Sequence, residues 1–126
     1  MITKKNLLLV ACGVLIGALA VGLAQQKQAQ TTQRTPQFEN PNVKVWKTLI
    51  MPNQPLTMHR HENGRVIVAL QGGTLTIKPE KGNPKRVVWE TGKAYWLDAD
   101  PPGEMHGDVN ETTKPIEVMV VELQKK

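Results

Sequence analysis

The sequence predicts an all-β domain of about eight strands that closes into a jelly-roll barrel. From residue 41 onward, short runs rich in β-branched and aromatic residues recur, and none has the apolar period of a helix. Turn-forming residues separate these runs, among them Asn63-Gly64, Gly72-Gly73 and Pro101-Pro102-Gly103. Many short strands separated by such turns are typical of sandwiches and barrels, and a doubled Greek key is the simplest way to close them.

The predicted strands take up most of the chain after residue 41. In the first of them, valines alternate with Lys44 and Trp46, so both faces can be used. The large aromatic residues lie in apolar strand runs, so we expect all of them to pack in the core; they are Trp46, Trp89, Tyr95 and Trp96. In chain order the predicted strands are Val43–Ile50, Leu56–His61, Arg65–Gln71, Thr74–Lys78, Arg86–Glu90, Ala94–Leu97, Met105–Val109 and Ile116–Leu123.

The first 24 residues have a different composition from the rest. Lys4 and Lys5 precede an uncharged apolar run over residues 7–24, which ends in Gly22-Leu23-Ala24. A basic start, an apolar stretch and small residues at its exit are typical of a secretory signal peptide, here cleaved after Ala24 or alternatively after Ala20. The run is also just long enough to remain as a membrane anchor. Both interpretations predict an exported domain. We expect it to be periplasmic, and the alternatives are a secreted or a membrane-anchored domain.

The single cysteine, Cys12, lies in a stretch that resembles a lipoprotein box. A lipid-modified cysteine should end the apolar run, whereas this run continues, so we interpret Cys12 as one more small apolar residue. The formal net charge is +5, but Lys and Arg are scattered and form no basic stripe with aromatic residues. We therefore expect no nucleic-acid partner, and membrane contact only through an uncleaved amino terminus.

Residues 25–40 are predicted to be a flexible linker, because six glutamines lie between positions 25 and 37 without an apolar period. The globular domain is then residues 41–126. A chain of this size can bury only a modest core, which is compatible with a homodimer.

The whole chain contains only three histidines, and two of them form His59-Arg60-His61. Alternate residues of a strand point the same way, so His59 and His61 should project inward together while Arg60 and Glu62 face outward. Two imidazoles one pleat apart can bind one metal ion. An exposed His-x-His is common without a metal, so the pair alone leaves the question open.

The spacing of the histidines resembles the two sequence motifs of the cupin superfamily. The first motif, G-x5-H-x-H-x3,4-E-x6-G, matches at His59, His61 and Gly72, but Asn53 replaces its first glycine and Arg65 its acidic residue. The second motif, P-x-G-x2-H-x3-N, matches at every fixed position over residues 101–110, which places His106 at the third ligand position. The resemblance covers most of the domain.

This resemblance implies a cupin-type double-stranded β-helix that holds a divalent transition metal, such as Fe, Mn, Ni, Zn or Cu. The implied ligands are His59, His61 and His106, and Asn110 is implied to be a structural turn residue. Three imidazoles with open positions suit these metals. Gln71 or Glu104 is conceivable as an oxygen ligand. Asp98 and Asp100 are interpreted as turn-stabilising residues.

Arg65 leaves three outcomes open, because a guanidinium repels a cation. It turns outward and pairs with Glu62, it lines the pocket and binds an anionic ligand beside the metal, or it replaces the metal's charge in a metal-free site. The first functional hypothesis is a metal-dependent oxygenase, isomerase or lyase acting on a small molecule. The alternative is a non-catalytic, metal-free module that binds a small anion through Arg65, and a third is a structural protein. The sequence identifies no catalytic residue, so whether the protein is an enzyme stays open.

Overall fold

The computed structural model describes residues 29–125, and within them the chain forms eight strands and no helix. The predicted signal peptide or anchor, together with Cys12, lies outside the described residues. No helix long and apolar enough to cross a membrane occurs among residues 29–125. The strands are β1 (Gln33–Glu39), β2 (Val43–Ile50), β3 (Arg65–Gln71), β4 (Gly73–Pro79), β5 (Lys85–Trp89), β6 (Ala94–Leu97), β7 (His106–Val109) and β8 (Ile116–Leu123).

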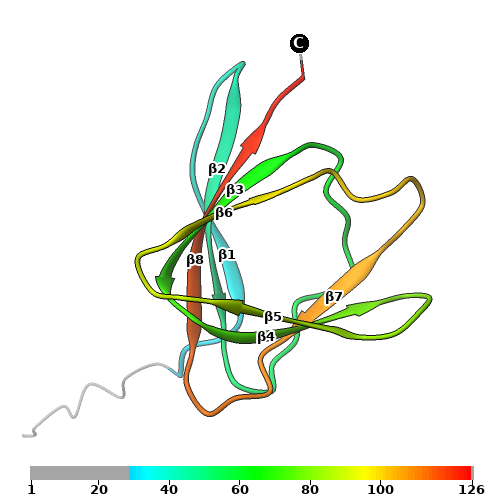
Figure 1. Cartoon of the computed structure of the whole chain (residues 1–126). Coiled ribbons are helices and arrows are strands. Elements are labelled where there is room, and N and C mark those ends of the chain that lie inside the picture. Colours follow the sequence, from blue (N-terminus) through cyan, green and yellow to red (C-terminus); the bar gives the residue numbers. More distant parts are fainter. Residues whose placement is uncertain (1–28, 126) are drawn as a thin grey trace, which may run out of the picture.

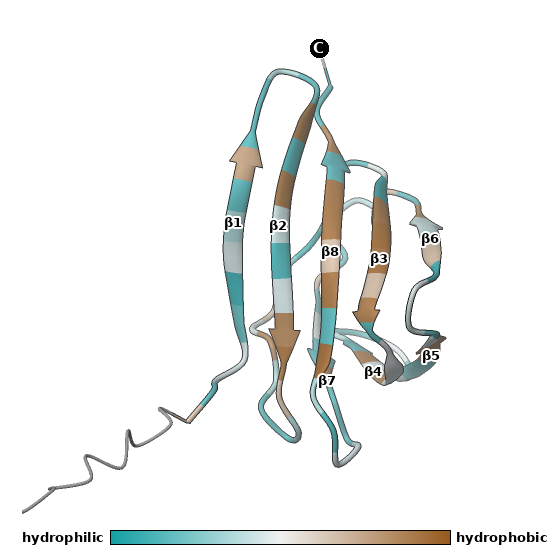
Figure 2. Ribbon diagram, turned by 90° about the vertical axis from the view of Figure 1, so that its left-hand side faces the viewer, coloured by the Kyte–Doolittle hydropathy of each residue, from teal (hydrophilic) through white to brown (hydrophobic). Residues whose placement is uncertain are grey.

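The strands form two antiparallel sheets that face each other across the barrel interior (Figure 1). The five-stranded sheet has the order β1-β2-β8-β3-β6 and is seen face-on in Figure 2, and the three-stranded sheet has the order β5-β4-β7. The chain passes from the first sheet to the second at Gly72, between β3 and β4. A Cβ atom at Gly72 would lie 2.1 Å from the Trp89 carbonyl oxygen, so only glycine fits this crossing.

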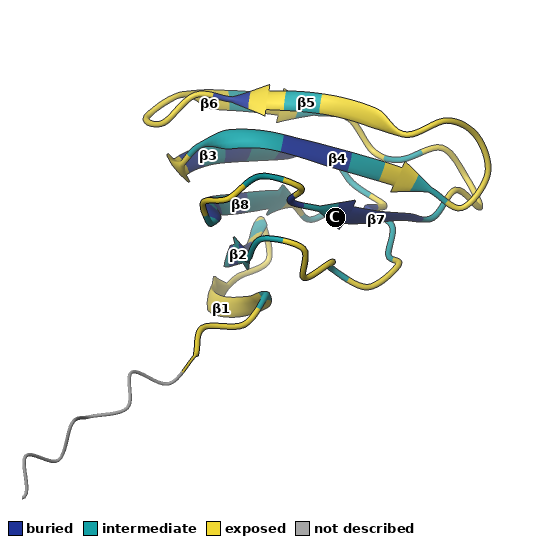
Figure 3. Cartoon of the chain, turned by 90° about the horizontal axis from the view of Figure 1, so that it is seen from below, coloured by how far each residue is buried: buried dark blue, intermediate teal, exposed yellow. Residues whose placement is uncertain are grey.

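Strand β1 corrects the predicted linker. It pairs antiparallel with β2 from Gln33 opposite Leu49 to Glu39 opposite Lys44, with a register shift between Pro36 and Phe38. All its residues are exposed (Figure 3), so it carries no apolar alternation that would mark a strand. As an edge strand it also tolerates Pro36. The linker prediction is therefore wrong for Gln33–Glu39, and the sheets begin there rather than at residue 41.

The segment Leu56–His61 corrects the strand prediction in the opposite direction. It belongs to no strand, and its ladder contact is one antiparallel bridge between His59 and His106. Leu56 N–H also donates to the Asp108 carbonyl. The segment therefore lies along β7 as extended chain without forming a regular ladder. The chain still forms eight strands, because β1 forms and the predicted strand Leu56–His61 does not.

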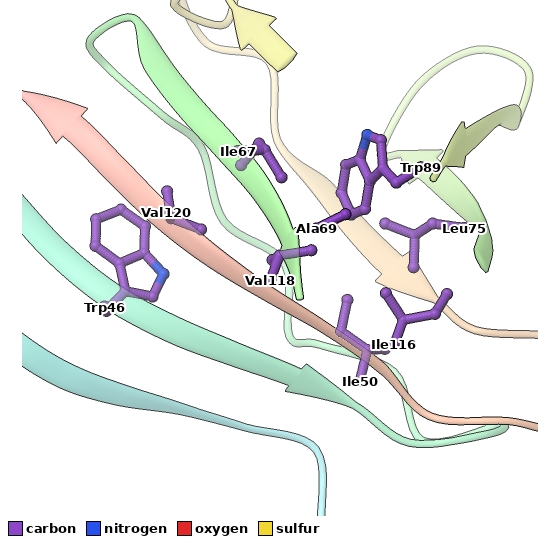
Figure 4. Close-up of a cluster of buried hydrophobic side chains, with 9 residues drawn as sticks. All are labelled: Trp46, Ile50, Ile67, Ala69, Leu75, Trp89, Ile116, Val118 and Val120. Carbon is purple, nitrogen blue, oxygen red and sulfur yellow. The ribbon is translucent and has the colours of Figure 1, made fainter. Parts of the chain in front are cut away.

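The hydrophobic core lies between the two sheets (Figure 4). Ile50, Leu75 and Ile116 are almost completely buried, and Trp46 and Trp89 are buried with them. Tyr95 packs against this core while partly exposed. The core prediction is wrong for Trp96, which is 54% exposed on the edge strand β6 and donates its Nε1–H to Asp98 Oδ1 at 2.8 Å.

Candidate metal centre

Inward-facing residues change from apolar to polar along two neighbouring strands of the large sheet. On β8 the inward row is Ile116, Val118, Val120 and Glu122, and on β3 it is Ala69, Ile67 and Arg65. The register pairs Ala69 with Val118 and Arg65 with Glu122. Because side chains of a strand alternate between faces, this register collects the polar groups at one end of the barrel interior.

The three histidines meet at this polar end, as their spacing predicted. His59 and His61 come from the extended segment, and His106 comes from the start of β7. The ring centroids are 4.5 Å apart for His59 and His106, 5.0 Å for His59 and His61, and 5.6 Å for His61 and His106. One nitrogen of each ring lies within 4.8 Å of those of the other two, so the three are candidate ligands of a single ion.

His59 has the tautomer that a metal ligand needs. Its Nδ1 lies 2.7 Å from the Thr57 carbonyl oxygen, which can only accept, so Nδ1 carries the proton and Nε2 has a free lone pair. Burial, chiefly, lowers the pKa of His59 to about 4, and nearby Arg34 also lowers it. The imidazole is therefore neutral near pH 7, as metal ligation requires. Its buried Nε2 has no hydrogen-bond partner among the described residues.

Carboxylates orient the other two rings. His61 Nδ1 lies 3.1 Å from Glu122 Oε2, and the His61 backbone N–H donates to Asp100 Oδ2 at 2.6 Å. His106 Nδ1 lies 3.5 Å from the same Asp100 oxygen. All three Nδ1 atoms thus face an oxygen, which leaves the Nε2 atoms as the metal-binding positions. This pattern of oxygen partners behind the ligand rings is characteristic of metal-bound histidines.

Asp108 is a residue of this site that sequence reasoning missed. It follows His106 by two residues on β7, so the two side chains face the same way. Its Oδ2 lies 3.6 Å from His59 Nε2, and its Oδ1 lies 3.8 Å from His106 Nε2. Oδ1 is buried without a hydrogen-bond partner among residues 29–125. Burial raises the pKa of Asp108, against the opposing effect of His106.

Arg65 lines the cavity, so the outcome in which it turns outward to Glu62 is wrong. It is 6% exposed, whereas Glu62 lies on the surface. Its guanidinium lies 3.7 Å from Asp100 Oδ1 and donates to the Asp98 carbonyl oxygen at 3.0 Å. Asp100 is thus more than a turn residue, because it links Arg65 to His61 and His106. Whether Arg65 also contacts a ligand stays a prediction.

The charges around the histidines favour a cation. Three carboxylates, Asp100, Asp108 and Glu122, face two guanidinium groups, Arg34 and Arg65. Four buried side-chain atoms within residues 29–125 have no hydrogen-bond partner, and two of them, Trp46 Nε1 and Arg60 Nε, are donors. The other two, His59 Nε2 and Asp108 Oδ1, are an electron-pair donor and a carboxylate oxygen. These two are ligand atoms for a divalent transition metal, so the residues present fit such an ion.

The cavity at the histidines is small, about 40 Å³. It has room for an ion and a few water molecules, but not for an organic ligand. Gln71 and Glu104, which were considered as oxygen ligands, are exposed and do not line it. Asp108, in contrast, lines this cavity.

Two other motif residues have structural roles. Asn53, in place of the expected glycine, has φ of +54°, a left-handed conformation that asparagine adopts more readily than most residues. Asn110 is fully buried and donates through Nδ2 to the carbonyl oxygens of Ile50 at 3.0 Å and Lys114 at 2.7 Å. Its Oδ1 accepts from the Thr112 backbone N–H. The structural role implied for Asn110 is therefore confirmed.

Several solved structures similar to this chain are described as cupins. A cupin domain from Bordetella pertussis Tohama I superposes with a TM-score of 0.67 at 21% identity, covering 78% of this chain and 98% of that one. An RmlC-like cupin family protein with a double-stranded β-helix fold from Methanocaldococcus jannaschii gives 0.59 at 13% identity, covering 78% and 84%. A cupin superfamily protein from Desulfitobacterium hafniense DCB-2 gives 0.54 at 11% identity, covering 82% and 88%.

No protein-family model and no curated protein matches the sequence. The structural likenesses nevertheless agree with the two-sheet topology, so the predicted cupin-type double-stranded β-helix is confirmed.

Proposed function

We propose that this protein, which has the cupin fold, binds one divalent transition metal ion through the Nε2 atoms of His59, His61 and His106. The observation that carries the proposal is the arrangement of the rings, each with an oxygen atom facing Nδ1. At His59 and His61 an Nδ1 proton directed at the facing oxygen fixes the tautomer, so the Nε2 lone pair is left for the shared cavity. Folding therefore orients these ligand rings before any metal binds.

Asp108 is proposed as the fourth protein ligand, in place of the acidic residue that Arg65 displaces. Its two oxygens lie 3.6 Å and 3.8 Å from the nearest histidine nitrogens. A carboxylate also offsets the charge of a divalent ion, which three neutral imidazoles do not. The pair between Arg65 and Asp100 offsets the charge of the guanidinium beside the ion.

A bound metal would supply Lewis acidity or oxygen chemistry to a small molecule at its open positions. Around it, the histidines and Asp108 hold the ion, while Asp100 and Glu122 keep the rings oriented. The apolar residues behind the site, such as Ile67 and Val120, exclude bulk water. Oxygenase, isomerase and lyase activities are all compatible with this arrangement, because the fold does not select among them.

The proposal is tested by titrating the metal-depleted, full-length protein, made without a histidine tag and kept in mild detergent, with Zn, Fe, Mn, Ni and Cu. Calorimetry should give one site per chain in the parent. Asp108→Asn should weaken binding about tenfold or more, whereas Asp98→Asn, a matched change outside the cavity, should leave it unchanged. Absence of binding for all five metals, or equal affinity in the two variants, would reject the proposed ligand set.

A further inference from the structure

A second, larger cavity lies against the histidine site. Its volume is about 480 Å³, within the range of small-molecule sites. It lies beside the edge strand β1 and shares Arg34, Trp46 and His61 with the small histidine cavity. Because the small cavity holds little more than an ion, an organic ligand that reaches this centre has to lie in the larger one.

The charged groups of this cavity favour an anion. Three basic residues line it, Arg34, Lys44 and Arg60. Two carboxylates line it as well: Glu39 accepts a hydrogen bond from Gln124 Nε2 at 3.1 Å, and Glu122 faces His61. The three cationic groups therefore exceed the two anionic ones, and none of the three forms an ion pair within residues 29–125.

Arg34 is the best placed of the three basic residues. It is the one that lines both cavities, so its guanidinium lies at their junction. Within residues 29–125 its side chain forms no ion pair and no hydrogen bond; the guanidinium lies over the face of Trp46, 5.8 Å from the ring centroid, and interacts with Asp108 and Glu122 only at longer range. Arg65, in contrast, already contacts Asp100 and the Asp98 carbonyl. A free planar guanidinium can bind a carboxylate with two parallel hydrogen bonds.

Much of the remaining wall is apolar, although Gln37 also lines the cavity. Phe38, Val45 and Trp46 line the cavity, and Phe38 is 57% exposed although its strand contributes nothing to the core. The Trp46 ring, which the Arg34 guanidinium faces, is suited together with that guanidinium to a ligand with one flat apolar end and one anionic end.

We propose that the larger cavity binds a small organic monocarboxylate with a flat apolar body, whose carboxylate is held by Arg34. The inference rests on the proposed function for the position of the ligand beside the metal. It assigns the anion-binding role to Arg34 of β1, a strand outside the predicted domain, rather than to Arg65.

Calorimetric titration of the full-length protein with benzoate tests this inference, with benzamide as the uncharged analogue of the same shape. We expect benzoate to bind the parent at least about tenfold more tightly than benzamide, since a charge-assisted pair is lost in the amide. Arg34→Gln should weaken benzoate binding about tenfold or more. Arg86→Gln, a matched change on the edge strand β5 of the other sheet, should alter it less than about twofold.

Metal binding is measured on the same variants, so that the two proposals fail separately. Arg34→Gln should still bind about one metal ion per chain, with an affinity equal to or higher than the parent's, because the change removes a positive charge near the site and no ligand. Equal benzoate affinity in Arg34→Gln and the parent would overturn the inference. So would an absence of benzoate binding, loss of metal in Arg34→Gln, or inorganic phosphate binding as tightly as benzoate. Benzoate binding without any metal binding would reject the proposed metal centre and leave the role of Arg34 standing.

Discussion

The two ends of the barrel interior are built on the same strands but from opposite chemistries. At one end, Ala69 of β3 faces Val118 of β8 among buried aliphatic side chains. Four residues along the same strands, about 13 Å away, Arg65 faces Glu122 beside the histidines. The first end is a packed core, and the second collects charged groups that are only partly satisfied by one another.

This difference indicates which end serves stability and which serves function. Buried polar atoms without partners are rare in folded proteins and cost free energy, so they are concentrated where a ligand can satisfy them. His59 Nε2 and Asp108 Oδ1 are such atoms, and both lie at the histidine end. Changes at the apolar end should therefore reduce stability and spare metal binding, and changes at the histidine end should do the reverse.

The largest effect on stability is expected from Leu75→Ala. Leu75 is 1% exposed in the core, so its truncation leaves a cavity and should cost about 2–5 kcal/mol of unfolding free energy. Guanidinium denaturation measures this cost, and the folded fraction should still bind metal. Val88→Ala on the exposed face of β5 is the control, with less than about 0.5 kcal/mol expected. Equal costs for the two variants would mean that Leu75 is not at the centre of the core.

Asn110→Ala should give the next largest loss of stability. The substitution leaves the Ile50 and Lys114 carbonyl oxygens without their donor, which should cost about 1–3 kcal/mol. The exposed Asn83→Ala serves as the control in the same denaturation experiment. Metal affinity should not change, because Asn110 fixes the turn after β7 and contacts no histidine ring. A loss of metal affinity without a loss of stability would place Asn110 in the functional end instead.

Glu122→Gln should reduce metal affinity without reducing stability. A glutamine oxygen still accepts from His61 Nδ1, but it carries no charge. Metal affinity should therefore fall by about tenfold, which is the lower end of the range for residues that hydrogen-bond to metal ligands. The free energy of unfolding of the metal-free protein should stay the same or rise. Glu117→Gln, outward-facing on the same strand near Lys47, is the matched control for metal affinity. If both variants bind metal equally, Glu122 does not orient His61.

The smallest effect is expected for Trp96→Phe. Trp96 is exposed, so loss of its hydrogen bond to Asp98 should change the free energy of unfolding by less than about 0.5 kcal/mol. Thermal or guanidinium denaturation would measure the change. A cost of several kcal/mol would indicate that Trp96 packs in the core, as its sequence context predicted.

What the sequence could predict follows from the same contrast. Strands with a buried face, such as β2, β3 and β8, were located to the residue because their apolar residues alternate between turns. Strand β1 was missed because it buries neither face, and Leu56–His61 was overpredicted because composition does not reveal whether a neighbouring strand pairs with it. The cluster of three histidines was predictable from motif spacing.

The carboxylates of the site were harder to find. Asp108 was detectable in principle, since it follows His106 by two residues and must share its face. Glu122 and the pairing of Asp100 with Arg65 were not, because strand register brings them together from distant parts of the chain.

The metal content of the protein as isolated tests the central claim most directly. The full-length protein without a histidine tag is compared with a His59→Ala, His106→Ala double variant by elemental analysis, with circular dichroism to show that both are folded. We predict about one equivalent of a divalent transition metal in the parent and none in the variant. A parent without metal, or a folded double variant that keeps the parent's metal, would contradict the account.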